Sequence, residues 1–555
     1  MAQPGHGVLT DDARRSIEEL LAGPDAEAAR LYPGDDGSRQ PAHTVYVPGD
    51  RYAPELTTQW GSAARAALQD GGGIEHLLEA HGLVPDAAEC AVIGAQVLAK
   101  LEREPVEDLR IDFEDGNGDR GDAAEDDAVV AAARAVAVAG RAGQLPPYVG
   151  IRFKCFEPST RARGLRTLDL FVTELARDGD LPDGLVPTLR KVTTIAQVQA
   201  MVLGCEHLER SLALAAGRLR FEIQVETPEA ILGPDGTALI APMLHAGAGR
   251  VSGLHYGTYD YSASLGIAAA YQSMAYQSME HPAADHAKAV MQLAAAGTGV
   301  RISDGSTNVI PLGEPDAVDR AWAPHGRLVT RSLERGFYQG LDLHPAHLPS
   351  RFAATYAFFR ASLPDVLGRL GADVAGREGA VLDEPATARS MAWFVLRGLD
   401  CGAVGSAEVT GASTGRSWSR WSDPSDVKAA EGMPELTVNG EGMRRRAPQH
   451  RRGRAPRRGP DRPAVPLLLR AGRVRGHLPG RVRWAAYVPG EQRADGSLTS
   501  HRPRRLHDHL LRFQQVENRL HDTESTCSAS GSPTSQTRTG RPTRTSDPDE
   551  RSAPR

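Results

Sequence analysis

The sequence predicts an α/β protein, a (β/α)₈ TIM barrel followed by C-terminal helices and a basic tail. Eight short runs rich in β-branched residues recur along the chain, and Ala-rich stretches of helical composition separate them. Strands that alternate with helices form parallel sheets, and eight such units close into a barrel more readily than they form an open sheet. A doubly wound sheet is the alternative, because two neighbouring strands could be misassigned.

The predicted strands and helices occupy the first 350 residues in regular alternation. The strands are expected at Thr44–Val47, Leu109–Glu114, Tyr148–Phe153, Leu185–Val192, Leu219–Glu226, Val251–Tyr256, Val300–Asp304 and Gly336–His344. Helices are expected at Ala123–Ala142, Arg163–Arg177, Ile195–Cys205 and Pro282–Ala296. We therefore assign residues 1–43 to an N-terminal helical segment and residues 44–350 to the barrel.

The amino-acid composition of the chain changes twice after the eighth run. Pro349–Leu370 and Ala386–Leu399 have helical composition, so residues 351–420 are expected to be a helical extension that caps the barrel or reaches a neighbouring subunit. Residues 421–555 are expected to be an Arg/Pro/Gly-rich, low-complexity tail, either disordered or translated out of frame from a GC-rich gene. A basic arm that binds RNA or an anionic surface is the alternative.

Charge and composition limit the partners. From Glu441 on there are 25 of the 64 basic residues and 11 of the 70 acidic ones, a net charge of +14, against −20 for the first 440 residues. The acidic body argues against nucleic acid as a partner. No run approaches the roughly 18 apolar residues of a membrane span, and we expect a cytoplasmic homo-oligomer. The five scattered cysteines predict reduced structural thiols.

Charged residues stand where the second and third runs end. Asp112, Glu114 and Asp115 close the second run, and Arg152 lies near the end of the third. Catalytic groups of such barrels sit at the carboxyl ends of the strands, and an arginine there suits bidentate binding of a substrate carboxylate. The alternatives are a turn whose acids face water and a salt bridge from Arg152 to Glu114 or Asp115.

The fifth and sixth runs add two further candidate acids. Strand alternation places Glu222, Gln224 and Glu226 on one face, which in a barrel can be the lumen, and Asp260 follows the sixth run. Two carboxylates from neighbouring strand ends, with water and substrate oxygens completing the shell, form an open Mg²⁺ site. His255 is either a general base or a buried, hydrogen-bonded histidine.

Five segments carry a resemblance to a known family, in the family's order. They are Val47-Pro48-Gly49-Asp50-Arg51, Ile111-Asp112-Phe113-Glu114-Asp115, Val225-Glu226-Thr227-Pro228, Tyr256-Gly257-Thr258-Tyr259-Asp260-Tyr261 with Leu265-Gly266, and Leu343-His344-Pro345-Ala346-His347-Leu348. With them the chain resembles the HpcH/HpaI aldolase and citrate lyase beta-subunit superfamily. The resemblance implies a barrel of the phosphoenolpyruvate/pyruvate-binding type.

The resemblance also implies roles for individual residues. Glu226 and Asp260 would bind Mg²⁺ or Mn²⁺, Arg152 would bind the carboxylate or carbonyl of the substrate, and Glu114 would orient substrate or metal-bound water. Two further residues of the motifs are expected to contact the substrate, Asp112 and Arg51.

The expected function is therefore a metal-dependent carbon–carbon lyase or aldolase, or the reverse condensation. Its substrate would be a small hydroxy or oxo acid, or the CoA thioester of one, reacting through a metal-stabilised enolate. A malate synthase-like condensing enzyme and a catalytically inert barrel that acts as a binding or regulatory subunit are the alternatives. An insertion around Thr57–Glu104, and His347 where the family often has Gln, leave the use of CoA open.

Overall fold

The computed structural model describes residues 8–83, 85–118, 120–177, 179, 181–267, 279–374, 385–412, 436–439 and 442–445. Eight parallel strands form one sheet in the order β7-β6-β5-β4-β3-β2-β1-β8. The strands are β1 His43–Pro48, β2 Asp108–Asp112, β3 Tyr148–Arg152, β4 Thr188–Leu189, β5 Phe221–Val225, β6 Val251–Tyr256, β7 Arg301–Ser303 and β8 Gly340–Asp342.

The two ends of the sheet meet and nearly close it into a barrel. Ser303 pairs with Gln339 in a parallel bridge, and the N–H of Asp304 donates to the carbonyl of Gln339 over 2.8 Å. The predicted (β/α)₈ barrel is thereby confirmed, and the doubly wound alternative is wrong.

Each predicted strand coincides with an observed one, and β4 is the shortest. Pro187, just before it, has no N–H to donate, and the pairing before it continues only as a bridge between Val149 and Leu185. The ladder is therefore interrupted on the amino-terminal side of β4.

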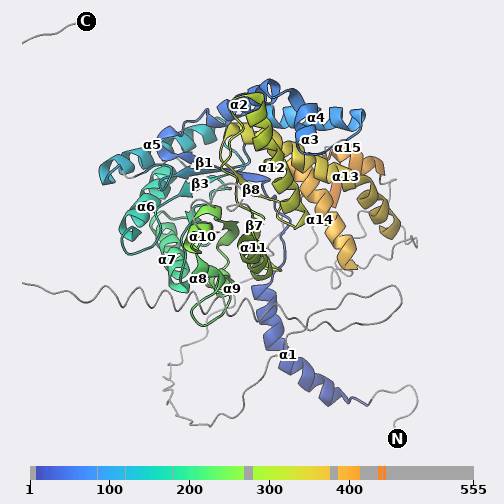
Figure 1. The fold of residues 1–555 in the computed structure, drawn as a ribbon. Helices are drawn as coiled ribbons and strands as arrows, with labels where there is room; N and C mark the ends of the chain where they lie inside the picture. The colour runs from blue at the N-terminus through green and yellow to red at the C-terminus, as the bar shows by residue number, and fades with distance from the viewer. Residues whose placement is uncertain are drawn as a thin grey trace, which may run out of the picture. The chain divides into compact units, whose positions relative to one another are not determined.

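Helices surround the strands, and α5, α6 and α7 follow one another around the barrel in Figure 1. The helices are α1 Asp11–Leu31, α2 Leu56–Asp70, α3 Gly73–Ala80, α4 Ala87–Arg103, α5 Asp122–Arg141, α6 Arg161–Arg177, α7 Ile195–Ser211, α8 Pro228–Ile231, α9 Ile240–Ala246, α10 Thr258–Ser264, α11 Pro282–Ala295, α12 Pro315–Glu334, α13 Leu348–Val374, α14 Pro385–Cys401 and α15 Ser406–Ala412, with short 3₁₀ turns η1 Gly49–Arg51 and η3 Pro345–His347.

The six helices expected from composition all occur, as α5, α6, α7, α11, α13 and α14. In α5 the buried residues Val129, Ala132, Ala133 and Val136 recur at the spacing of one helical face. The segment expected to be an insertion forms α2, α3 and α4, which pack against one another and against α13. α2 also contacts η3, just beyond the carboxyl end of β8.

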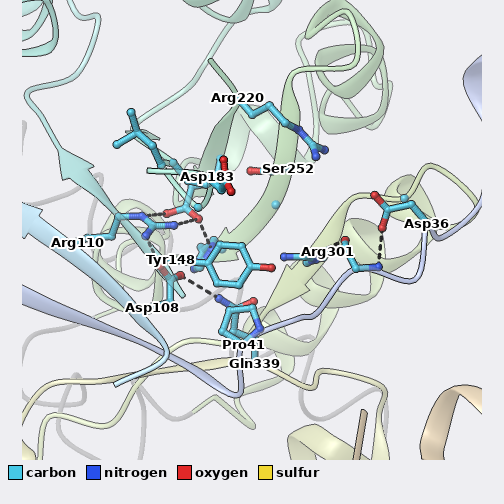
Figure 2. Close-up of a pocket in the computed structure, with 18 residues that line it drawn as sticks. Asp36, Pro41, Asp108, Arg110, Tyr148, Asp183, Arg220, Ser252, Arg301 and Gln339 are labelled. Carbon is cyan, nitrogen blue, oxygen red and sulfur yellow. Dashed lines mark hydrogen bonds and ion pairs between the residues drawn. The ribbon is translucent and has the colours of Figure 1, made fainter. Parts of the chain in front are cut away.

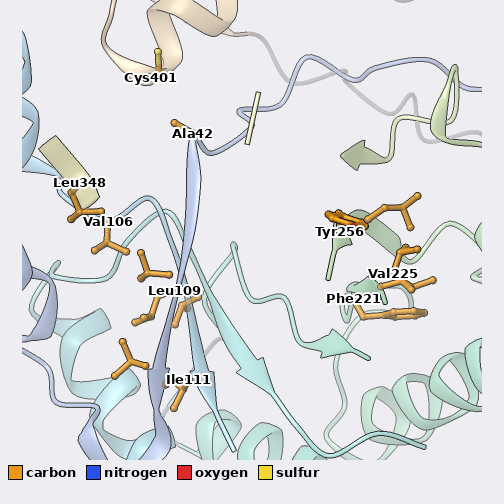
Figure 3. Packing of buried hydrophobic residues seen from close by; sticks show 14 of the residues in the cluster. Ala42, Val106, Leu109, Ile111, Phe221, Val225, Tyr256, Leu348 and Cys401 are labelled. Atoms are coloured by element: carbon orange, nitrogen blue, oxygen red, sulfur yellow. The ribbon is translucent and has the colours of Figure 1, made fainter. Parts of the chain in front are cut away.

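Side chains on opposite faces of the strands form two different interiors. Leu109 and Ile111 of β2 and Val225 of β5 belong to the hydrophobic core between strands and helices (Figure 3). The alternate positions face the lumen, where Arg110 donates to Glu222 over 2.9 and 2.8 Å. This lumen is polar and buried, so its charges depend on one another for partners.

After α15 the structure describes only residues 436–439 and 442–445. β9 Leu436–Asn439 and β10 Gly442–Arg445 form an antiparallel pair, and the rest of the predicted low-complexity tail lies outside the described residues.

No described helix is long and apolar enough to cross a membrane. Within the described part of the chain the cysteines are free and buried, at positions 90, 155, 205 and 401.

Candidate functional site

A cavity of about 430 Å³ lies at the carboxyl ends of the strands. Most of its charged lining comes from the ends of β2, β3, β5 and β6 or the loops after them, and includes Asp112, Asp115, Arg152, Glu226 and Asp260. These strand ends meet because parallel strands of a barrel all point the same way. The structure thus brings together the acids and the arginine that the sequence singles out.

Arg190, directly after β4, occupies the centre of this cluster. Its Nε donates to Glu226 Oε1 over 2.9 Å, its Nη2 to Asp260 Oδ2 over 2.7 Å and its Nη1 to Asp115 Oδ2 over 2.8 Å. Nη1 also contacts Glu114. The side chain is fully buried, so one guanidinium ties together acids from three strand ends.

Local backbone geometry places these groups. Lys191 has a left-handed φ of 49°, a conformation that costs about 1–3 kcal/mol for a non-glycine residue. Its N–H then donates to Glu226 Oε1 over 3.1 Å. Gly257 lies against the other side of Glu226, where an added Cβ would stand 2.4 Å from the Cβ of Glu226. The glycine therefore allows the end of β6 to approach β5 closely.

Glu226 and Asp260 differ in their electrostatic setting. Burial raises the pKa of Glu226, although Arg190 and Arg152 oppose the shift. Burial acts in the same direction on Asp260, but the charges of Arg190 and Lys191 prevail and lower the pKa of that carboxyl. The two carboxylates also lie within hydrogen-bonding reach of each other, so they are close enough to share one cation.

Arg152 makes contacts that fit both of its expected roles. Its Nη1 donates to Asp112 over 2.8 Å, and its Nη2 lies 2.9 Å from Asp115 and 3.2 Å from Glu114. These are the salt bridges of the structural alternative. The guanidinium also borders the cavity, lies 5.1 Å from the ring centroid of Tyr46 and keeps a buried Nε that has no hydrogen-bond partner among the described residues.

His255 borders the same cavity but is turned toward the lumen. Its Nε2 lies 2.7 Å from Glu222 Oε2, and the side chain is buried. This is the contact expected of a buried, hydrogen-bonded histidine, and a role as general base stays a prediction.

Of the two remaining predicted residues, Asp112 lines the cavity and Arg51 does not. Asp112 accepts from the N–H groups of Glu114 and Gly116 over 3.1 and 2.9 Å, so it shapes the turn after β2 as well as lining the cavity. Arg51 is exposed in η1 and is not among the residues that line the cavity. A contact from Arg51 to substrate therefore stays a prediction.

Sequence reasoning missed Arg190 and Lys191. They stand at the end of the predicted run Leu185–Val192, so the rule of strand-end position applied to them as it did to Arg152. The sequence also assigns no role to Asp304, which ends the seventh predicted strand. Asp304 is buried and accepts from Lys288 Nζ over 2.9 Å, an ion pair beside the same cavity.

The donor chemistry of this site suits a hard divalent cation. Among the described residues no group of three or more His, Cys, Asp or Glu side chains is arranged to hold a metal ion by itself. Five carboxylates nevertheless face three cationic side chains, an excess of two negative charges: Asp112, Glu114, Asp115, Glu226 and Asp260 against Arg152, Arg190 and Lys191. Carboxylate oxygens with water or substrate in the other positions are what Mg²⁺ accepts.

The fold and this site define an α/β barrel protein with a charged cavity at the carboxyl ends of its strands. The chain belongs to the family described as "Domain of unknown function (DUF6986)", which matches residues 21–428. No curated protein matches it.

Several solved structures are similar to the chain at low sequence identity. A citrate lyase from Burkholderia xenovorans is 18% identical with a TM-score of 0.46, covering 68% of this chain and 97% of that one. A citrate lyase beta subunit from M. tuberculosis, complexed with oxaloacetate and magnesium, is 16% identical with a TM-score of 0.33, covering 59% and 99%. A malate synthase from Haloferax volcanii is 14% identical with a TM-score of 0.37, covering 57% and 76%.

Proposed function

We propose that this protein is a divalent-cation-dependent carbon–carbon lyase or aldolase. Its substrate is a small hydroxy or oxo acid, or the CoA thioester of one, and the reverse condensation uses the same site. The observation that carries the proposal is the meeting of Glu226 and Asp260 beside Arg152 at the strand-end cavity. The motifs that resemble the citrate lyase beta-subunit superfamily supply Glu226 and Asp260, and Arg152 stands near the end of the third predicted strand.

Each residue then has a role that follows from its contacts. Glu226 and Asp260 would hold Mg²⁺ or Mn²⁺, which as a Lewis acid would stabilise an enolate oxygen. Arg152 binds the substrate carboxylate with a planar fork that a lysine cannot reproduce. Arg190, which contacts both acids, is a positioning residue that keeps two like charges close together.

Cation binding tests the site without any knowledge of the substrate. Titration of the full chain with Mn²⁺ should reveal one site, and Glu226→Gln and Asp260→Asn should each weaken it at least about tenfold, or about 1.4 kcal/mol. Glu229→Gln is a matched control, because Glu229 is an exposed acid three residues from Glu226. Unchanged Mn²⁺ affinity in both site variants would remove these carboxylates from the proposal.

Turnover tests the reaction class separately. The Mn²⁺-loaded protein should release pyruvate or an acyl-CoA from some member of a panel of hydroxy-oxo acids and hydroxyacyl-CoA thioesters. If the protein binds Mn²⁺ through Glu226 and Asp260 but cleaves no member of the panel, the proposed cation site stands and the proposed reaction is wrong.

A further inference from the structure

A second cavity, of about 190 Å³, lies at the amino-terminal end of the barrel. Its walls come from the starts of the strands and the segments that lead into them, including Tyr148 of β3 and Arg301 of β7 (Figure 2). Glu222 and His255 of the lumen also line it. The proposed reaction at the opposite end of the strands makes no use of this cavity.

Two arginines facing this cavity lack the carboxylate partners that other arginines of the barrel have. Arg220, just before β5, and Arg301 form no ion pair with a carboxylate in the part of the chain that the structure describes. Arg110, in the same lining, is paired with both Asp108 and Glu222. Unpaired guanidinium groups that share a small cavity favour an anionic occupant.

The surroundings of the two arginines differ. Arg301 lies 5.3 Å from the ring centroid of Tyr148 and donates to Ser38 Oγ, and its charge also acts on the nearby carboxylate of Asp36. The side chain of Arg220 is exposed and makes no hydrogen bond within the described residues. Burial of part of it, followed by the charge of Arg301, lowers the pKa of its guanidinium, and the charge of Asp36 opposes that shift. The two cations therefore repel each other, Asp36 offsets part of that repulsion, and a bound anion would relieve the rest.

Besides Asp108 and Glu222, which pair with Arg110, two further acids at the cavity limit the charge of its occupant. In the segment before β1, Asp36 accepts a hydrogen bond from the N–H of Ser38 over 2.8 Å. Asp183 is exposed in the loop before β4. Figure 2 shows Asp36 on the Arg301 side of the cavity and Asp183 on the Arg220 side. A ligand with one anionic group can approach both arginines, while a polyanion would be repelled by these acids.

We propose that this amino-terminal cavity is a binding site for a small anion that presents a single carboxylate or phosphate group to Arg220 and Arg301. The group accepts hydrogen bonds from both guanidiniums, and the small volume excludes a nucleotide or a CoA thioester. The site is separate from the strand-end cavity and does not depend on the reaction proposed there.

Calorimetric titration of the full chain tests the site with inorganic phosphate and with acetate as separate probes. At least one should bind, and Arg220→Gln should weaken that binding at least about tenfold, a loss of about 1.4 kcal/mol. Arg220 suits substitution because it makes no hydrogen bond within the described residues, so the variant should fold. Arg210→Gln, an exposed arginine on α7, is the matched control and should bind as the unaltered chain does.

A second variant separates this cavity from the strand-end cavity. Arg152→Gln, at the opposite end of the barrel, should retain the binding that Arg220→Gln loses. Binding of phosphate alone identifies a phosphate site, and binding of acetate alone identifies a carboxylate site. The proposal is overturned if neither probe binds, if Arg220→Gln binds as well as Arg210→Gln, or if Arg152→Gln alone abolishes binding.

Discussion

Arg152 contacts the acids after β2 and borders the strand-end cavity, and one substitution separates the two roles. If the guanidinium binds a substrate carboxylate, Arg152→Lys should raise KM and lower kcat, with at least roughly tenfold lost in kcat/KM, about 1.4 kcal/mol. If it only pairs with the neighbouring acids, the variant should melt earlier and show near-normal kinetics. Steady-state kinetics and thermal melts of this variant decide, and unchanged kinetics would remove Arg152 from the site.

Arg190 is the residue whose loss should disturb the site most. Arg190→Gln leaves Glu226 and Asp260 adjacent without their shared counter-charge, so we expect a loss of about 3–5 kcal/mol in the free energy of unfolding. Millimolar Mg²⁺ should restore more stability to this variant than it adds to the unaltered protein, because the cation would replace the missing charge.

Urea unfolding with and without Mg²⁺ measures both effects of Arg190→Gln. Arg15→Gln is the control, since its ion pair with Asp12 is exposed on both sides and should contribute about 0–1 kcal/mol. Equal responses of Arg190→Gln and the unaltered chain to Mg²⁺ would contradict a cation site at these acids.

At the scale of elements, a buried histidine cluster joins the end of the barrel to its outer helices. His325 of α12 lies 3.1 Å from Asp342 of β8 and 2.7 Å from Ser350 Oγ of α13, and His81, just after α3, lies 2.8 Å from the same hydroxyl. Ser350, His325 and Asp342 contact one another in the same order as the members of a Ser-His-Asp catalytic triad. Ser350 is fully buried and lines neither cavity, so the cluster is structural.

This cluster predicts a loss of stability in mild acid. Burial lowers the pKa of His81 to about 3 and that of His325 to about 4, while the unfolded chain titrates near 6.5. Below pH 6.5 the unfolded state binds protons that the folded state refuses, so stability is full above that pH and falls toward pH 4. Each histidine contributes a slope of about 1.4 kcal/mol per pH unit.

Unfolding free energies between pH 4.5 and 7 check this slope. His81→Gln should flatten it, because the substitution removes one titrating group while an amide can still reach Ser350. His207→Gln, at an exposed histidine on α7, should leave the slope as it is. A slope that His81→Gln does not change would show that other groups cause the acid sensitivity.

At the scale of the whole molecule, the charge is divided between an acidic body and a basic end. Truncation after Trp421 keeps α15, whose Glu408 pairs with Arg360 over 2.9 Å, and removes residues 422–555, in which the sequence from Glu441 on is aperiodic and has no lysine. We expect the melting temperature and Mn²⁺ affinity of residues 1–421 to match those of the full chain. A clear drop in melting temperature would show that the removed residues stabilise the barrel.

The sequence by itself determined the strands, six of the fifteen α-helices in the part of the chain that the structure describes, and the acids at the strand ends. These features are local: period-two runs, helical composition and the position of a charge after an apolar run can be read within about ten residues. Local sequence alone therefore places Glu114, Arg152, Glu226 and Asp260 at one end of the barrel.

Only the tertiary structure decided which charges meet. Arg190 binds Glu226, Asp260 and Asp115, which lie 36, 70 and 75 residues away in the chain, and no local pattern encodes such a pairing. The same holds for the amino-terminal cavity, where Arg220 and Arg301, which form no ion pair within the described residues, come from segments about 80 residues apart in the chain. Barrel closure brings distant strand ends together, and burial then determines which charges find a partner within the chain and which remain free to bind a ligand.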